Sequence, residues 1–428
     1  MKRFNFLLPL MVLLTLVISA CGGTTSTSGS QKVTINWWHI NNTDPLKTEW
    51  QSLATQYMQT HKNVDINISV IGTDQNYQQK LETAMQAGTP PDIFQSWGGG
   101  VMQEYAQAGQ LQDISSALQQ NGWGDTFSQS ALSLYSYNGH YYGVPWDIGA
   151  VGFWYNPTLF AKASIQQPPV TWNDFLTDIQ KLKTAGVTPI ALGEKDKWQG
   201  LFYWVYLAMR EGGKTAFDNA YNRTGSFADP AYVKAGQMLQ QLVATKPFEN
   251  GFLGEDYTAE QALMGNGKAA MELMGQWGPS NDASAAADKK GPSLSFFPFP
   301  QVPGGAGNPT DVQGGGNGFA IGKNAPPQTI DFVRFLTQAN NQRALAQKGA
   351  LLPPVKAASD GVTNPNMQAV VKLVSNAPYF QLYYDQFLPS VVAQVAINST
   401  QALFAGSATP LATAQAVENS AATALKKA

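Results

Sequence analysis

Cysteine is almost absent from this sequence. Its 428 residues contain a single cysteine, Cys21, close to the N-terminus. One thiol cannot form a disulfide within the chain, and it cannot supply a cysteine-based zinc or thiolate site. The fold must therefore be held by hydrophobic cores, for which a chain of this length is ample.

Charged residues are also scarce. Asp, Glu, Lys and Arg make up 13% of the chain, about half of their share in an average soluble protein. The formal net charge is −2, and it becomes −4 once Lys2 and Arg3 are set aside, because 25 of the 27 basic residues then face 29 acidic ones. Nucleic acid is not expected as a partner, since phosphate binding needs a concentrated basic surface. The sequence instead contains 11 Trp, 16 Tyr, 21 Phe and many Asn and Gln, a mixture that suits a neutral polyhydroxylated ligand.

Signatures of catalysis are missing as well. The three histidines are far apart and form no His-Glu-x-x-His pair, and neither a Gly-x-Ser-x-Gly elbow nor a complete phosphate loop is present. We therefore expect no enzyme, no metal and no cofactor. One enzymatic alternative stays open. A secreted glycosidase needs an acid and a nucleophile on either side of a sugar, and it could draw them from carboxylates such as Asp92, Asp147 and Glu272.

The N-terminus predicts export. Lys2 and Arg3 precede an apolar run from Phe4 to Ile18, which ends in small residues before Cys21. This run is shorter than the roughly 20 apolar residues of a spanning helix. The pattern resembles a bacterial lipoprotein signal, which implies that residues 1–20 are removed and that Cys21 is lipidated. Two acyl chains would then hold the protein on the outer face of the cell membrane; a plain secretory signal with an incidental cysteine is the alternative.

Beyond a flexible tether at residues 21–30, strands and helices alternate. Val33, Ile35 and Trp37 have the spacing of a half-buried strand, and residues 46–57 have the spacing of a helix. A second strand over 64–70, a helix closing at Gly88 and a third strand from Pro91 complete an α/β unit. The alternation returns after residue 150, where Thr171 and Asp174 form a capping box. One continuous helix is predicted over 328–347.

Motifs along nearly the whole chain resemble the extracellular solute-binding proteins of carbohydrate ABC transporters, in the oligosaccharide-binding group. No single motif is specific to this family, but the order of the motifs behind the lipoprotein signal is specific to it. They are Trp37-Trp38-His39, Thr89-Pro90-Pro91-Asp92-Ile93-Phe94, Trp97-Gly98-Gly99-Gly100, Tyr142-Gly143-Val144-Pro145-Trp146-Asp147, Phe153-Trp154-Tyr155-Asn156-Pro157, Thr171-Trp172-Asn173-Asp174-Phe175, Gly267-Lys268-Ala269-Ala270-Met271, Gly275-Gln276-Trp277 and Gly314-Gly315-Gly316-Asn317-Gly318-Phe319.

The resemblance implies a two-lobed α/β fold, each lobe a mostly parallel sheet flanked by helices, with the ligand in the cleft between them. We expect the first lobe to comprise residues 31–147 and 306–340, and the second 148–305 and 341–428. The implied function is a monomeric receptor that binds an oligosaccharide and delivers it to the permease subunits of an ABC importer. A surface adhesin that binds carbohydrate without a transporter is a further alternative.

Sugar binding needs flat apolar faces for the rings and planar polar groups for the hydroxyls. In the first lobe we expect these from Trp38 and His39 at the end of the first strand, and from Trp97 and Gly98 in a glycine-rich loop. Trp37 alternates with Trp38 and should lie in the core. Trp50, Trp154, Trp172 and Trp204 also have core spacing.

The remaining candidates lie where the chain passes between lobes or within the second lobe. Asp147 either binds hydroxyls or fixes the crossing of the chain, and the cluster around Tyr384 and Asp385 is either a ligand wall or ordinary helix packing. The full set of expected ligand-binding residues is Trp38, His39, Trp97, Gly98, Asp147, Trp198, Trp277, Gly315, Tyr384 and Asp385.

Overall fold

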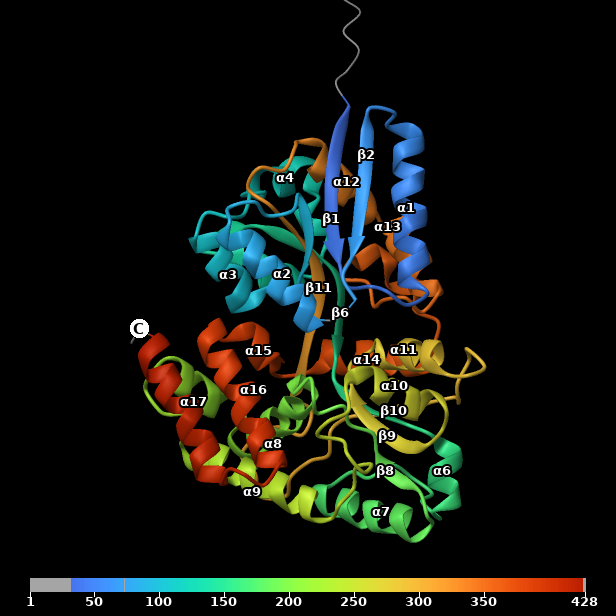
Figure 1. Ribbon diagram of the computed structural model, residues 1–428, viewed down its shortest axis with the longest axis vertical. Coiled ribbons are helices and arrows are strands. Elements are labelled where there is room, and N and C mark those ends of the chain that lie inside the picture. The colour runs from blue at the N-terminus through green and yellow to red at the C-terminus, as the bar shows by residue number, and fades with distance from the viewer. Residues whose placement is uncertain (1–31, 73, 426–428) are drawn as a thin grey trace, which may run out of the picture.

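The computed structural model describes residues 32–72 and 74–425, and it shows two lobes stacked along the longest axis (Figure 1). The predicted signal segment, Cys21 and the tether lie outside the described residues. Within them, no helix combines the length and the apolar character needed to cross a membrane.

The first lobe is built on a six-stranded sheet of order β12-β11-β3-β1-β2, with β6 also paired to β11. β1 is parallel to β2 and β3, and β12 is parallel to β11, whereas β11 is antiparallel to β3 and β6. The strands are β1 (Val33–His39), β2 (Val64–Val70), β3 (Ile93–Ser96), β6 (Gly143–Ala150), β11 (Val312–Ile321) and β12 (Phe380–Leu382).

The second lobe contains a four-stranded sheet of order β10-β7-β9-β8. Only β8 and β9 are parallel; β7 is antiparallel to both β9 and β10. The expectation of a mostly parallel sheet is therefore wrong for this lobe. The parallel strands β8 and β9 are joined by a long helical connection, whereas β7 pairs with strands that come much later in the chain, so no single helical crossover sets its direction. The strands are β7 (Gly152–Tyr155), β8 (Thr188–Ile190), β9 (Ala269–Met274) and β10 (Ser295–Phe297), and a separate hairpin is formed by β4 (Ser136–Tyr137) and β5 (His140–Tyr141).

Helices cover both sheets. The predicted capping box is confirmed: the Thr171 hydroxyl accepts from the Asp174 N–H, and the Asp174 carboxylate accepts from Thr171. The helix predicted over 328–347 is two helices, because the chain is extended at Gln338. The α-helices are α1 (Leu46–Thr60), α2 (Asp74–Gln86), α3 (Gly99–Gln107), α4 (Ser115–Gln119), α5 (Gln129–Leu132), α6 (Pro157–Lys162), α7 (Trp172–Thr184), α8 (Trp198–Tyr221), α9 (Pro230–Ala244), α10 (Tyr257–Gly265), α11 (Gly278–Ala285), α12 (Gln328–Leu336), α13 (Ala339–Gln347), α14 (Pro365–Asn376), α15 (Tyr384–Phe387), α16 (Ser390–Phe404) and α17 (Pro410–Ala424). Short 3₁₀ turns are η1 (Gln120–Gly122), η2 (Gly124–Thr126), η3 (Ser133–Tyr135) and η4 (Lys356–Gly361).

The antiparallel pair β6 and β11 runs from the upper lobe toward the lower one, and we call these the crossing strands (Figure 1). β6 is followed after one residue, Val151, by β7 of the second sheet. The lobe boundaries stay a prediction, and one element departs from the division at residue 341, since β12 pairs with β11 in the first sheet.

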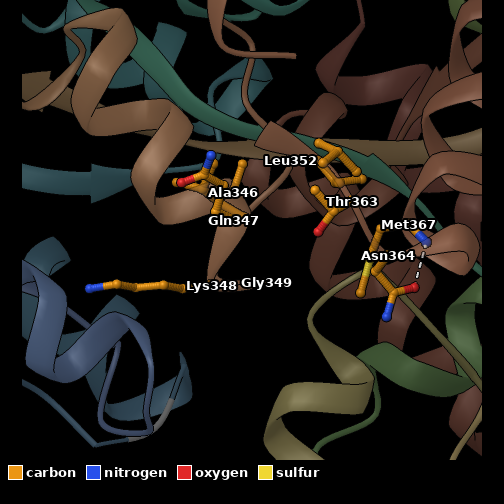
Figure 2. A pocket seen from close by; sticks show the side chains of 10 residues that line it. Ala346, Gln347, Lys348, Gly349, Leu352, Thr363, Asn364 and Met367 are labelled. Atoms are coloured by element: carbon orange, nitrogen blue, oxygen red, sulfur yellow. Dashed lines mark hydrogen bonds between the residues drawn. The ribbon is translucent and has the colours of Figure 1, made fainter. Parts of the chain in front are cut away.

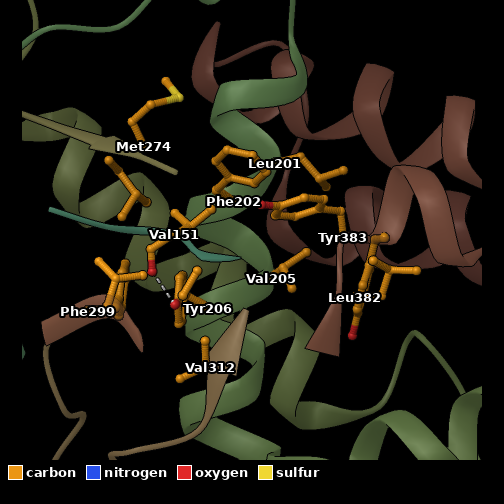
Figure 3. Packing of buried hydrophobic residues seen from close by; sticks show 14 of the residues in the cluster. Val151, Leu201, Phe202, Val205, Tyr206, Met274, Phe299, Val312, Leu382 and Tyr383 are labelled. Atoms are coloured by element: carbon orange, nitrogen blue, oxygen red, sulfur yellow. Dashed lines mark hydrogen bonds between the residues drawn. The ribbon is translucent and has the colours of Figure 1, made fainter. Parts of the chain in front are cut away.

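Large aromatic side chains fill the cores. Trp37 lies edge-on to Trp50 and Phe319, and the predicted core positions of Trp37, Trp50, Trp154, Trp172 and Trp204 are all confirmed by their burial. In the second lobe, α8 packs against the segment after β6, where the Tyr206 hydroxyl donates to the Val151 carbonyl (Figure 3). The crossing strands are thus packed firmly at their second-lobe end.

Candidate functional site

A row of aromatic rings lies in the second lobe, and we call it the aromatic wall: Trp198, Phe202, Tyr257, Trp277 and Tyr383. The Trp198 ring is 5.1 Å from Tyr257 and 5.5 Å from Phe202, centroid to centroid. Phe202 is 5.3 Å from Tyr383, beside which it lies in Figure 3, and Tyr383 is 6.3 Å from Trp277. Both tryptophans are only partly buried. The structure therefore connects the predicted Trp198 and Trp277, which are partly exposed, through the buried rings of Phe202 and Tyr383.

Local backbone geometry positions the two tryptophans. Trp198 opens α8, directly after Lys197 in the left-handed conformation at φ 70°. Trp277 immediately precedes α11, and its ring lies over Gly275, where a Cβ atom would come within 2.2 Å of it. Only glycine fits that approach.

Tyr383 belongs to the wall, whereas its neighbour Tyr384 does not. Tyr384 is 1% exposed and packs against Trp204 and Phe217, so its predicted role as a ligand contact is corrected to a core role. Tyr383 directly precedes the short α15 and Tyr384 opens it, and the sequence does not show which of these two adjacent residues faces the wall. Gly315 lies behind Tyr383, where a Cβ would come within 2.4 Å of the ring, so it supports the wall.

The glycine-rich loop of the first lobe reaches the same region. A Cβ on Gly99 would lie 2.4 Å from the Gln386 carbonyl, and one on Gly100 would lie 2.5 Å from that of Phe387. Gly98 has φ 71° and precedes α3. This close packing places Trp97 and Gly98 next to the segment that carries Asp385. Gly99 and Gly100 belong to the recognised motif, but their packing role depends on a partner almost 290 residues away in the chain and was not predicted.

The side chains of Asp385, Trp38 and Trp97 are partly exposed. The Oδ2 atom of Asp385 accepts from the Gln386 amide, whereas its Oδ1 atom has no donor among the described residues. Burial raises the pKa of Asp385 to about 6. Trp97 lies edge-on to Tyr77 at 5.9 Å, and the Lys80 ammonium lies 4.4 Å from the Trp38 ring. These residues retain surfaces that a ligand can contact.

His39 lies elsewhere. The alternation that turns Trp37 into the core also turns His39 inward, where it is 2% exposed and edge-on to Trp37. Its Nδ1 atom accepts from the Asn41 N–H, and burial lowers the pKa of His39 to about 4. The predicted ligand contact is corrected to a neutral core histidine.

Asp147 joins the crossing strands to both lobes. Its Oδ1 atom accepts from the Leu352 N–H at 2.9 Å, and its Oδ2 atom accepts from Gln276 Nε2 at 2.5 Å and from Asn317 Nδ2 at 3.1 Å. Burial raises the pKa of Asp147 to about 6, although hydrogen bonds from these three donors oppose the shift. Of the two predicted roles, this geometry favours the fixing of the chain crossing, because both oxygens already have partners.

Direct hydrogen bonds also join the lobes at two places away from the crossing strands. The Thr43 hydroxyl donates to Asn281 at 3.0 Å, while Asn281 donates to the Tyr257 hydroxyl of the wall. On the other side, the hydroxyl of Ser390 donates to the Glu104 carboxylate at 2.7 Å. The two lobes are therefore in contact on both flanks of the wall, as expected for a closed arrangement.

A separate pocket of about 340 Å³ lies where α13 ends and α14 begins (Figure 2). Thr363 and Met367 lie on one side of it, and the Lys348 side chain extends away from them, where its ammonium donates to Glu49. Leu352, which donates to Asp147, also lines it. None of its lining residues belongs to the predicted site. Among residues 32–72 and 74–425, no group of His, Cys, Asp and Glu side chains has the arrangement of a metal site.

Comparison with known proteins decides the family. The profile described as bacterial extracellular solute-binding protein matches residues 42–343, well over half of the sequence. The chain belongs to this family. Membership agrees with the predicted extracytoplasmic location.

Relatives of this solute-binding protein include sugar receptors. It is 28% identical over 291 residues to an uncharacterized ABC transporter extracellular-binding protein of Pyrococcus horikoshii, and the alignment spans 64% of either chain. It is 24% identical over 352 residues, 78% of either chain, to the diacetylchitobiose binding protein DasA of Streptomyces coelicolor.

Solved structures agree. A structure described under xylan utilization by the thermophilic bacterium Caldanaerobius polysaccharolyticus has a TM-score of 0.84 at 29% identity, covering 90% of this chain and 99% of that one. A chitin oligosaccharide binding protein also has a TM-score of 0.84, at 25% identity, with coverage of 92% and 99%. The predicted two-lobed α/β fold is thereby confirmed.

Proposed function

We propose that this solute-binding protein is the receptor of an ABC importer and captures an oligosaccharide between the aromatic wall and the first lobe. The observation that carries the proposal is the wall itself, in which Trp198 and Trp277 keep partly exposed faces beside the crossing strands. Such faces stack on the C–H-rich sides of sugar rings. The sugar-binding relatives support the same class of ligand.

The proposal includes no catalysis. A glycosidase needs two carboxyls that face each other across the sugar. Asp92 instead accepts from the backbone and side chain of Asn36, Asp147 has partners on both oxygens, and Glu272 is fully buried. The ligand is therefore bound and released unchanged, and the permease subunits are the partner that takes it.

A thermal-shift panel of mono- and oligosaccharides on residues 31–428 tests the function. The correct sugar, at about 100 times its dissociation constant, adds about 2.7 kcal/mol to the free energy of unfolding. After long incubation with the best ligand, chromatography should return it intact. If no sugar of the panel stabilises the protein, the proposed receptor function is contradicted. If protein-dependent cleavage products form in excess of the protein, the proposal of binding without catalysis is contradicted.

Lipid anchoring through Cys21 is the second part of the proposal, and it has its own test. Cys21→Ala in the native host should move the protein from the membrane fraction to the medium or the extracytoplasmic fluid, because no acyl chain can then be attached. Metabolic labelling with a fatty acid should mark the wild type only. A variant that stays membrane-bound and labelled would show that the anchor lies elsewhere.

A further inference from the structure

Four carboxyl groups are buried together in the second lobe, behind the aromatic wall. They come from four segments: Glu194 after β8, Glu260 in α10, Glu272 in β9 and Asp282 in α11. None is more than 1% exposed. We call these four residues the carboxyl cluster.

The cluster has almost no compensating groups. Glu260 accepts from the Gly193 N–H at 2.7 Å and from Gln199 Nε2 at 3.4 Å. Within the described residues, no N–H or hydroxyl group donates to Glu272 or Asp282; the carboxyl group of Glu272 instead faces those of Asp282 and Glu260. In the described part of the chain, the Gly200 backbone and the Lys197 ammonium act on Glu194 and oppose the rise of its pKa, and that ammonium donates to Asn398.

Burial is the largest influence on these groups, and repulsion from neighbouring carboxyls adds to it. Together they raise the pKa of Glu194, Glu260, Glu272 and Asp282 well above the ordinary carboxyl range. The other ionisable groups that face the cluster do not reverse this. They are Tyr203, Tyr257 and Glu249, and burial raises the pKa of Glu249 to about 7.

The uncharged side chain of Gln199 also indicates that the carboxyl cluster is protonated. The Gln199 Oε1 atom is buried without a donor, although its amide nitrogen reaches Glu260. Two carboxylates have no proton to share, whereas a protonated carboxyl supplies an O–H donor to its neighbour. Protonation therefore converts a set of mutually repelling acceptors into a hydrogen-bonded group.

The cluster adjoins the elements that present three of the five wall residues. Glu260 lies on α10, which begins at Tyr257, and Asp282 lies on α11, which begins directly after Trp277. α10 and α11 pack against each other. Gln199 follows Trp198 at the start of α8. A change of charge in the cluster therefore acts on the supports of three wall residues.

We propose that the carboxyl cluster is a proton-holding positioning unit: the wall keeps its binding geometry while the cluster is protonated, and sugar affinity falls as the pH rises. The effect on affinity rests on the proposed receptor function. The effect on the stability of the folded protein is independent of that function. The folded protein keeps protons that the unfolded chain releases above about pH 4.5. Stability contributed by the cluster is therefore lost as the pH rises through its raised folded-state pKa values.

Glu272→Gln is the decisive variant, because glutamine copies a protonated glutamate at every pH. Between about pH 5 and about pH 9, we expect the wild-type affinity for the best sugar to fall at least about tenfold, and that of Glu272→Gln to fall by a smaller factor, because one of the four titrating groups is then permanently neutral. Asp178→Asn is the matched control: Asp178 is a buried carboxylate of the same lobe, paired with Lys181 on α7. It should keep the wild-type pH profile.

Equal pH profiles for wild type and Glu272→Gln overturn the proposal. If Glu272→Gln does not fold, Asp282→Asn replaces it with the same expected outcome. Urea unfolding without sugar gives an independent reading, in which the wild type loses stability from about pH 5 to about pH 9 and Glu272→Gln loses less. If no sugar binds at any pH, the receptor function fails, and these sugar-free measurements still decide whether the cluster holds protons.

Discussion

Trp277→Ala weakens sugar binding by about 10- to 100-fold, which corresponds to roughly 1.4 to 2.7 kcal/mol. The loss has two sources: the apolar area that the ring buries against the ligand, and an aromatic contribution of about 0.5 to 1.5 kcal/mol beyond that area. The unliganded fold survives because Trp277 is only partly buried. Isothermal titration calorimetry with the best ligand of the panel measures the change.

Trp97→Ala should weaken binding by a similar factor from the first-lobe side, because its loop packs against the segment next to Asp385. Phe335→Ala is the control, since Phe335 is a partly buried aromatic on α12 that packs against Tyr57 in the first lobe. It should bind as the wild type does. Titrations of both tryptophan variants that match the wild type would remove these rings from the site.

Asp147→Ala lowers the free energy of unfolding by about 3 kcal/mol, because three buried donors lose their acceptor and each such loss costs about 1 to 3 kcal/mol. Those donors are the N–H of Leu352 and the side-chain amides of Gln276 and Asn317. Asp147→Asn should cost only about 1 kcal/mol, since its oxygen still accepts from Leu352 and the Gln276 amide, whose Oε1 atom has no donor, can turn over to accept from the new amide; the bond from Asn317 is lost, because Asn317 Oδ1 is held by Gln95.

Urea unfolding followed by circular dichroism compares the two variants. Asparagine preserves the shape of the aspartate side chain, and alanine does not. The difference between the two losses of unfolding free energy therefore shows how much a side chain of the same shape restores. Equal large losses for alanine and asparagine would contradict the expected rescue and would mean that both oxygens of the carboxylate are required. A small loss for both would mean that the crossing strands do not depend on it.

Local patterns in the sequence predict much of the fold. The alternation of Val33, Ile35 and Trp37 predicts β1, and the Thr171 and Asp174 pair predicts the start of α7. These features depend on neighbouring residues alone, so a single sequence contains them. The same alternation also places His39 on the Trp37 side, and it decides the position of this residue although His39 ends the strand.

Long-range packing decides what the sequence does not show. Whether Tyr383 or Tyr384 faces the wall depends on how α15 packs against the glycine loop. β7 pairs with β9 and β10, which come much later in the chain, so local patterns do not show the direction of these pairings. The four members of the carboxyl cluster lie in separate segments between residues 194 and 282, and no spacing between them signals that they meet.

The crystal structure of the complex with the best panel ligand tests the central claim most directly. We expect sugar rings stacked on Trp277 and Trp198, with Trp97 or Trp38 of the first lobe on the opposite side and hydroxyls bonded to groups such as Asp385. A ligand seated instead in the pocket lined by Leu352 and Met367, or on a surface away from the aromatic wall, would contradict the account.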